Sequence, residues 1–446
     1  MLPRANTARL IVRVAWRNVR RNWRHSLAAL GTMAVGFVAL ALFQGYLDEM
    51  LRTQLDLVYS RNMIGEVMVR KPGAGTRAGR AERWKYQLDE ADQQFLEAWI
   101  AAHPADVKTR VRTLLFSGMA HAGSSTAEFF AWGHDIPEAR VLRRGWVWNA
   151  WAGHPLREDE PSGALLGLTL ATRLGCVRTT DEPVMDPATG RPRPVERPFR
   201  CREKNVMLTA DSGHGRVNAL EAEVVGFSSA GVRDYDERMV WLPLAFTQDL
   251  AATHNVSHYM IALHHPADGA RVRAELSAAA RQAGRQLEVV DWKDTEGADL
   301  LRRGMELLAV YRRLVVLVIL VIAGAAVLTS MMKTVHERTR EVGTMRSLGY
   351  RGRHLLSMFA VEAVLLALHA GAAGLAVTTV ATALLNAANI TYKAGLMAES
   401  IPLRIGYSPG AWALGFLYLS LVAVTAALVA ARRVARMRIA GALSES

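Results

Sequence analysis

Residues 314–355 read LVVLVILVIAGAAVLTSMMKTVHERTREVGTMRSLGYRGRHL. The first 19 of them, 314–332, carry no charge, and about 20 apolar residues suffice to cross a bilayer. The segment that follows, 333–355, holds six basic and two acidic side chains. The abrupt change predicts a transmembrane helix that ends in a charged loop on one side of a membrane.

Three further stretches are long and apolar enough to cross a bilayer. Leu27–Leu47 and Ala411–Ala431 each contain 21 residues without a charge. Leu355–Ile390 is longer and includes Glu362 and His369. The chain is 51% hydrophobic and 21% charged, which fits a protein with both membrane and soluble parts. We therefore expect four transmembrane helices.

The basic charge of the chain lies beside these stretches. Segments 1–26, 333–355 and 432–446 carry net charges of +7, +4 and +3, more in total than the +13 of the whole chain. Short loops rich in Lys and Arg stay in the cytoplasm, so both termini and the loop 333–355 are expected inside. Segments 48–313 and 391–410 are then outside. Charge that clusters beside spans, without interleaved aromatic residues, argues against a nucleic-acid partner.

These observations divide the chain and predict its fold class. We expect an α-helical membrane protein with four transmembrane helices and a large mixed α+β domain inserted between the first two. The expected parts are a cytoplasmic amphipathic basic helix (1–26), four spans (27–47, 314–332, 355–390 and 411–431), an external segment of two helices and a domain (48–313), a cytoplasmic loop (333–354), a short external loop (391–410) and a cytoplasmic tail (432–446).

The first two spans do not end cleanly at the outer membrane surface. An apolar stripe at helical spacing continues beyond the first span, with Leu47, Met50, Leu51, Leu55 and Val58. A similar stripe precedes the second span, with Leu300, Leu301, Met305 and Leu308. Two helices that extend beyond the bilayer would form a stalk able to transmit rigid-body motion. Two short helices packed on the soluble domain are the alternative.

The external domain shows mixed α and β patterns. Strands are expected at 66–70, 107–122, 128–132, 220–227 and 239–242, with helices at 89–102 and 267–283. Cys176 and Cys201 bracket a Pro- and Arg-rich stretch. In an oxidising compartment the two thiols could form a disulfide at the base of that loop; two free thiols are the alternative.

The sequence contains no recognisable catalytic constellation. A phosphate-binding loop for ATP requires Gly-Lys-Ser/Thr, and no lysine of this chain follows a glycine. His264 and His265 lack further ligands at metal-binding spacing, so we expect a solvated pair and no metal. Asp234 and Asp236 are expected in a turn. Accordingly, neither catalytic residues nor a cofactor are expected on this chain.

Glu362 and His369 are the polar residues of interest within the spans. Ionisable groups inside a membrane are functional candidates by default. A structural role is the alternative, because Glu362 lies about two turns from the inner end of its span, where it could reach water or the basic loop. His369 could form a hydrogen bond between helices. Ala370, Gly371 and Gly374 nearby favour close helix packing.

The charged loop carries a family resemblance. HERTREVGTMRSLGYRGRHL (336–355) resembles the signature of the FtsX-like permease domain of ABC transporters, roughly Glu-Arg-x-x-Glu-Ile-Gly-x-x-Arg-Ala-Leu-Gly. Residues 335–348 suit a short helix that stops at Gly349. The resemblance implies that this is a coupling helix docked on an ATPase, with contact residues Glu337, Arg338, Arg340, Glu341, Val342, Gly343, Met345, Arg346, Leu348 and Gly349.

Other stretches extend the resemblance to the FtsX-like/MacB-like (type VII) permeases. AWRNVRRNWRHSLAAL (15–30), Glu362 followed by two glycines, and ARRVARMRIAGAL (431–443) are similar to the ends of that family. In the external domain, 226–250 and 289–301 resemble the lipoprotein-releasing LolC/LolE-type permeases, which implies a MacB-like periplasmic core domain. The stretch 177–200 looks like an insertion relative to them.

The resemblance implies a function and partners. It implies a multi-pass permease in the inner membrane of a Gram-negative bacterium, paired with a second copy or a sister permease and with two cytoplasmic ABC ATPase subunits that bind ATP and Mg. A periplasmic chaperone or adaptor is allowed as a further partner. The expected cargo is a lipoprotein or another amphiphile. The alternatives are mechanotransmission that gates a periplasmic enzyme, and MacB-like efflux of peptides or small molecules.

Overall fold

The computed structural model describes residues 13–17, 23–56, 60–179, 186, 191, 193–211, 216–231, 233–337, 339–347, 350, 352–392 and 401–435. Within this part the chain forms two compact units. A helical unit comprises residues 1–51, 305–390 and 403–446, and an outer unit comprises 52–304 and 391–402. The unit boundaries fall inside two long helices.

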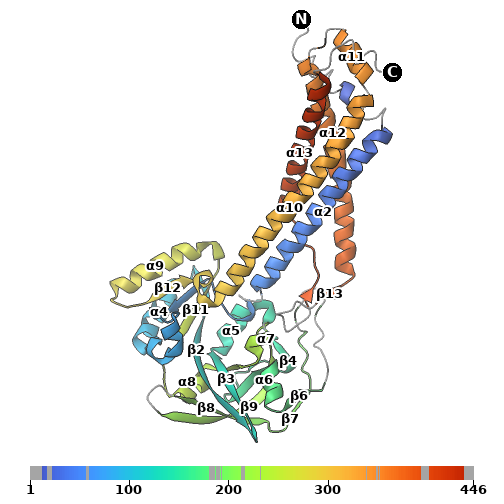
Figure 1. Ribbon diagram of the computed structural model, residues 1–446. Coiled ribbons are helices and arrows are strands. Elements are labelled where there is room, and N and C mark those ends of the chain that lie inside the picture. The colour runs from blue at the N-terminus through green and yellow to red at the C-terminus, as the bar shows by residue number, and fades with distance from the viewer. Residues whose placement is uncertain are drawn as a thin grey trace. The chain divides into compact units, whose positions relative to one another are not determined.

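In the described part of the helical unit, four helices are long and apolar enough to cross a membrane, and a shorter one lies between two of them. They are α2 (Trp23–Asp56), α10 (Glu296–Glu337), α11 (Thr339–Ser347), α12 (Gly352–Ala387) and α13 (Pro409–Ala435) (Figure 1). The outer unit follows α2 and precedes α10, so the predicted fold class is confirmed.

Two of these helices are longer than a bilayer requires. At 1.5 Å per residue, the 34 residues of α2 span about 51 Å, and the 42 residues of α10 span about 63 Å. A hydrocarbon core is only about 30 Å thick. The turns beyond the length of a bilayer belong to the same continuous helices, α2 and α10. The sequence also allowed two separate short helices packed on the soluble domain. The predicted span 355–390 runs past the end of α12, because Asn389 has a φ of 47°, a left-handed conformation that ends a helix.

Small residues let α12 and α13 pack closely. Their shared core is largely alanine and contains Ala363, Ala367, Ala370, Ala423, Ala426, Ala427 and Ala430. A Cβ on Gly371 would collide with the Phe416 ring of α13, and one on Gly374 would lie 2.8 Å from Phe37 of α2. The expected role of these two glycines is confirmed, because close backbone approach is what stabilises helix pairs where no water is expelled.

Hydrogen bonds join the outer ends of α2, α12 and α13. The Gly406 N–H donates to the Gly45 carbonyl of α2 at 3.0 Å. The Asn386 side chain of α12 donates to the Ile405 carbonyl and accepts from the Ile405 N–H, both at 3.0 Å. The segment that leads into α13 is therefore held against both α2 and α12.

The outer unit is built on a ten-stranded sheet of order β12-β1-β11-β2-β3-β10-β5-β9-β4, with β8 pairing with β2 and β9. Only the β3–β10 and β5–β9 pairs are parallel. The strands are β1 (Val67–Arg70), β2 (Val107–Ala122), β3 (Ser125–His134), β4 (Ala150–Gly153), β5 (Gly163–Gly167), β8 (Asn205–Asp211), β9 (Val217–Ser228), β10 (Met239–Pro243), β11 (His258–Leu263) and β12 (Glu288–Asp291). Two further pairs lie outside this sheet, β6 (Cys176–Arg178) with β7 (Phe199–Cys201) and β13 (Thr391–Tyr392) with β14 (Ile401–Pro402).

Alternating side chains give the sheet two covered faces. Tyr259 and Ile261 of β11 enter the larger core, whereas Met260 between them enters the smaller one, as the two-residue period of a strand requires. The larger core is covered by α4 (Glu90–Ala102), α6 (Leu168–Arg173), α8 (Leu244–Ala251) and α9 (Gly269–Gln282), and the smaller by α5 (Ile136–Arg143). The short helices α3 (Arg77–Ala81) and α7 (Arg233–Asp236) complete the outer unit.

Most predicted elements of the outer unit are confirmed. The predicted strand 128–132 was too short, because β3 pairs with β2 from Ser125 to His134. Gly123, with a φ of 56°, makes the tight turn between these strands. The pairing therefore begins directly at the turn.

The two cysteines form a disulfide. Cys176 lies opposite Cys201 in the β6–β7 ladder, and their sulfur atoms are bonded. Of the two alternatives that the sequence allowed, the structure therefore has the disulfide. It closes a loop with a sequence separation of 25.

Replacing both cysteines by serine should destabilise the outer unit. Opening a loop of this length costs about 3 kcal/mol in the chain-entropy model, or roughly 6–12 °C in Tm for a domain of this size. Thermal unfolding of the purified full chain, followed by tryptophan fluorescence, measures the change. A reductant should lower the Tm of the parent chain equally and leave that of the double variant unchanged; equal Tm values for both oxidised proteins would contradict the prediction.

Candidate ATPase-coupling site

The charged loop contains a helix, α11, of nine residues, at the place where the sequence predicted a short helix. Its Met345 side chain packs against a cluster formed by Leu355, Met358 and Phe359 of α12 and Ala431 of α13. Gly343 is buried, whereas Thr344 and Ser347 are exposed. One face of α11 therefore rests on the ends of two spans, and another is open to a partner.

The end of α11 has the hydrogen-bond pattern of a helix stop. The Tyr350 N–H donates to the Met345 carbonyl at 3.1 Å, the six-to-one bond that closes a Schellman motif. The Ser347 hydroxyl donates to the Thr344 carbonyl at 2.8 Å. The glycine that this motif prefers was predicted at Gly349, which lies outside the described residues.

The structure corrects the start of the coupling helix. The sequence predicted one short helix over 335–348, but α10 continues to Glu337 and α11 begins at Thr339. Val335 therefore belongs to α10. The structure describes most of the remaining predicted contact residues. Four of them lie in helices, and Arg346 is half-buried on α11; the four are Glu337, Arg340, Glu341 and Val342. Arg338 and Leu348 lie outside the described residues.

The two intramembrane polar residues have different environments. Glu362 is 1% exposed, so its side chain is buried among other protein groups. His369 is exposed, and its Nδ1–H donates to the Leu365 carbonyl of its own helix at 2.7 Å. The expected hydrogen bond between helices is therefore not made by this nitrogen. The His369 ring lies 5.4 Å from the Trp16 ring of the N-terminal basic segment.

The apparent insertion 177–200 is tied to the end of α2. The Arg191 guanidinium forms an ion pair with the Asp56 carboxylate at 2.7 Å and lies 5.7 Å from the Trp146 ring. The Trp146 indole N–H donates to the same carboxylate at 2.8 Å. Burial raises the pKa of Asp56, but hydrogen bonds from Arg191 and Trp146 outweigh it and hold that pKa below its ordinary value. Sequence patterns missed this contact because it joins residues 135 positions apart.

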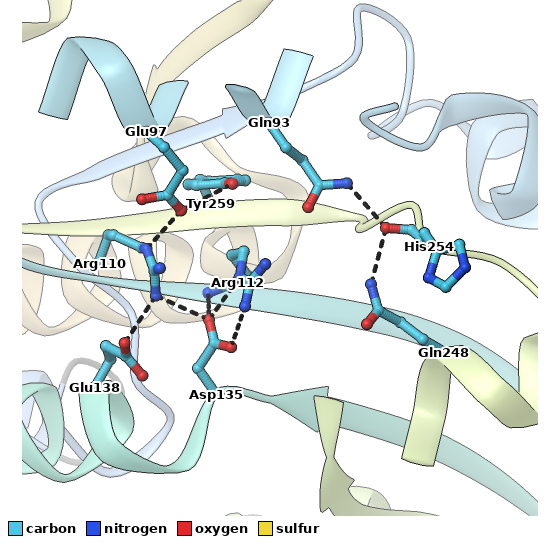
Figure 2. Close-up of polar contacts among 9 residues, drawn as sticks. All are labelled: Gln93, Glu97, Arg110, Arg112, Asp135, Glu138, Gln248, His254 and Tyr259. Atoms are coloured by element: carbon cyan, nitrogen blue, oxygen red, sulfur yellow. Dashed lines mark hydrogen bonds and ion pairs between the residues drawn. The ribbon is translucent and has the colours of Figure 1, made fainter. Parts of the chain in front are cut away.

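A polar network fixes the start of α5 on the sheet (Figure 2). Asp135, directly before α5, accepts hydrogen bonds from the backbone N–H and the guanidinium of Arg112 at 2.8–3.0 Å. Arg110 bridges Asp135, Glu138 of α5 and Glu97 of α4. The hydrogen bond to Asp135 raises the pKa of Arg112. Nearby in Figure 2, Gln93 of α4 and Gln248 of α8 both donate to the His254 carbonyl, at 2.9 and 2.8 Å.

The predicted turn around Asp234 and Asp236 is a single helical turn, α7, with a structural role. Asp236 is 1% exposed and accepts hydrogen bonds from the Ser229 hydroxyl at 2.6 Å and the Ala230 N–H at 2.7 Å. His264 and His265 are exposed. Within the described ranges, no group of three or more His, Cys, Asp or Glu side chains could hold a metal ion.

Comparison with known proteins assigns the C-terminal region. Residues 313–439 match the family model described as FtsX-like permease C-terminal. This region is similar to the FtsX-like permeases. The match covers α11 and the ends of α12 and α13 that contact it, so the packing of Met345 lies within the matched region.

Two curated relatives match about a third of the chain. The pyoverdine export ATP-binding/permease protein PvdT of Pseudomonas fluorescens (strain Pf0-1) is 32% identical over 153 residues, which cover 33% of this chain and 23% of that protein. The macrolide export ATP-binding/permease protein MacB of Escherichia coli (strain K12) is 32% identical over 130 residues, 29% of this chain and 18% of that protein. The chain thus spans less than a quarter of the length of these relatives.

Two solved structures align with about half of the chain. The periplasmic region of MacB from Actinobacillus actinomycetemcomitans aligns with 56% of this chain and 97% of that chain, with a TM-score of 0.34 and 11% identity. The extracellular domain of the ABC-type transporter YknZ from Gram-positive bacteria aligns with 50% and 98%, with a TM-score of 0.32 and 11% identity.

The contact between Asp56 and Arg191 predicts a pH dependence. Because the folded-state pKa of Asp56 lies below its ordinary value of 3.8, its contribution to stability is present above that value and is lost as pH falls through the folded pKa. Asp56→Asn should therefore lower the free energy of unfolding by about 1 kcal/mol at pH 7, a modest figure because the carboxylate is half-exposed.

Denaturant unfolding of the full chain at pH 7 and at pH 3 tests this. The difference between parent and variant should shrink at pH 3. Asp48→Asn, which alters a carboxylate that accepts from Ser408, is the control for a general effect of one lost charge on α2. A difference that persists unchanged at pH 3 would argue against a carboxylate-specific contact.

Proposed function

We propose that this chain is the permease subunit of an ATP-driven ABC export system in the bacterial inner membrane. In this role it converts ATP hydrolysis in the cytoplasm into motion of the outer domain. The observation that carries the proposal is the packing of α11 on α12 and α13 through Met345, within the matched permease region. A force applied to α11 is transmitted directly to two spans through buried contacts.

The two long helices supply the second half of this mechanism. Because α2 and α10 are continuous beyond the length needed to cross a bilayer, a tilt of either helix at its inner end moves its outer end as well. Interiors packed as tightly as the alanine interface of α12 and α13 deform little. Rigid helices are therefore suited to carry motion outward.

The ATPase, with its ATP and Mg, is proposed to be a separate chain. The names of both curated relatives join ATP-binding and permease functions in one protein. The sequence of this chain contains no Gly-Lys-Ser/Thr loop. Two copies of a cytoplasmic ATPase subunit, together with a second permease, would form the working unit. A periplasmic chaperone or adaptor would receive the cargo.

The proposed cargo is a lipoprotein or another amphiphile taken from the outer leaflet. The resemblance of 226–250 and 289–301 to lipoprotein-releasing permeases supports it. A second candidate is export of small molecules or peptides, favoured by the names of the curated relatives. Release of a labelled lipoprotein from proteoliposomes, measured beside efflux of a small amphiphile, separates the two candidates. A third alternative is gating of a periplasmic enzyme. It predicts ATP hydrolysis with neither lipoprotein release nor efflux of the small amphiphile.

The coupling assignment is tested by changing two charged residues of α11. In the purified complex, Glu341→Ala combined with Arg346→Ala should lower permease-stimulated ATPase activity about tenfold, because a coupling free energy of about 1.4 kcal/mol is typical of such contacts. Arg432→Ala, an exposed arginine at the inner end of α13, should leave the activity unchanged. If the double variant binds and stimulates the ATPase normally, α11 is not the coupling helix.

A further inference from the structure

Arg143, the last residue of α5, is a buried charge without a counter-charge. Its side chain is 5% exposed, and its Nε and Nη2 atoms have no hydrogen-bond partner in the described part of the chain. An unpaired buried charge is among the most expensive groups that a protein can contain. Native structures satisfy nearly all buried polar atoms, so an orphaned guanidinium indicates a missing ligand.

The groups that face Arg143 increase this cost. Arg61, which is 3% exposed, is the nearby charge that acts on it. Burial first, and then Arg61, lowers the pKa of Arg143 to about 9. His134, at the end of β3, is 1% exposed; burial and then the charge of Arg143 lower its pKa to about 3, so it is neutral at physiological pH. The positive Arg143 guanidinium is thus accompanied by the positive Arg61 and the neutral His134.

Asp56, an acid that shares Trp146 with Arg61, is already engaged, because it accepts from Trp146 and Arg191. The Arg61 guanidinium lies 4.8 Å from the centroid of the same Trp146 ring, which is a cation–π distance. Trp146 and Asp56 therefore organise Arg61 and Arg191, whereas Nε and Nη2 of Arg143 have no hydrogen-bond partner in the described part of the chain.

Arg143 cannot leave this environment easily. The network of Asp135 with Arg110 and Arg112 holds the start of α5 on the sheet, and Leu142 beside Arg143 is in the smaller core. The next residue, Arg144, has a φ of 51°. A residue other than glycine adopts such a backbone conformation only when its surroundings impose it. The fold therefore holds the guanidinium in place.

We propose that Arg143, together with Arg61 and His134, forms a binding site for a phosphate group in the outer unit. A guanidinium offers two parallel N–H donors that match the oxygens of an oxyanion. Arg61 supplies the second positive charge that a dianion favours. The group could be inorganic phosphate or the headgroup phosphate of a lipid. This site does not depend on the proposed function, because it rests on the outer unit alone.

The test uses the full chain in a phospholipid-free detergent, with phosphate compared against chloride at equal ionic strength. Phosphate at a hundredfold excess over its Kd should raise the Tm of the parent chain by about 5 °C or more. Arg143→Met should abolish this rise, and in chloride it should have a Tm at or above that of the parent, because it removes an unpaired buried charge.

Two matched variants keep the test specific. Arg140→Met changes an exposed arginine one turn earlier on α5 and should retain the full response to phosphate. Arg143→Lys keeps the charge but loses the planar donors, so it should bind at least tenfold more weakly. The proposal is overturned if phosphate does not raise the parent Tm, if Arg140→Met loses the response equally, or if Arg143→Met lowers the Tm in chloride.

A soluble lipid distinguishes the two sources of phosphate. Dihexanoyl phosphatidylglycerol, added below its micellar concentration, should raise the Tm further than inorganic phosphate if the site takes a headgroup. If it takes free phosphate, the lipid should have a smaller effect than inorganic phosphate. Either result requires Arg143; a rise that persists in Arg143→Met would place binding elsewhere and refute the site.

Discussion

Every part of this chain depends on the cost of placing charge in a bilayer. A charged residue at the centre of a span costs about 2.5–3.5 kcal/mol, so the 19 uncharged residues at 314–332 and the basic loop that follows them can be arranged in only one way. The same rule predicts that both termini and the loop 333–355 lie on one side. The large folded unit lies in the segment between α2 and α10.

Within that arrangement, α11 and the spans are joined by packed contacts. Met345 connects α11 to α12 and α13, and alanines bring the latter two helices together. At the other end, the hydrogen bonds of Gly406 with Gly45 and of Asn386 with Ile405 hold the segment before α13. Helix α11 is therefore connected to α2 through the packed contacts of α12 and α13 and through these hydrogen bonds.

The sequence predicted what depends on local pattern and missed what depends on distant contacts. The apolar runs predicted four helices, and strand-like runs predicted β2 and β10. Strands such as β5 and β11, buried along nearly their whole length, show no alternation and were not recognised. Of the candidate site, Met345 and Gly343 followed from the loop motif, but the break between α10 and α11 did not. The contact of Arg191 with Asp56 and the burial of Arg143 arise only when remote segments meet, so no local signal could reveal them.

The pairing of β1 with β12 has a consequence for biosynthesis. Val67 lies opposite Asp291, so the first strand of the outer unit is flanked on one side by its last. This edge of the sheet cannot close until more than two hundred residues have been translocated. Meanwhile β1 exposes an unpaired edge, which is a template for aggregation. The unit completes its sheet only as the second span is being synthesised, so its folding is timed to membrane insertion.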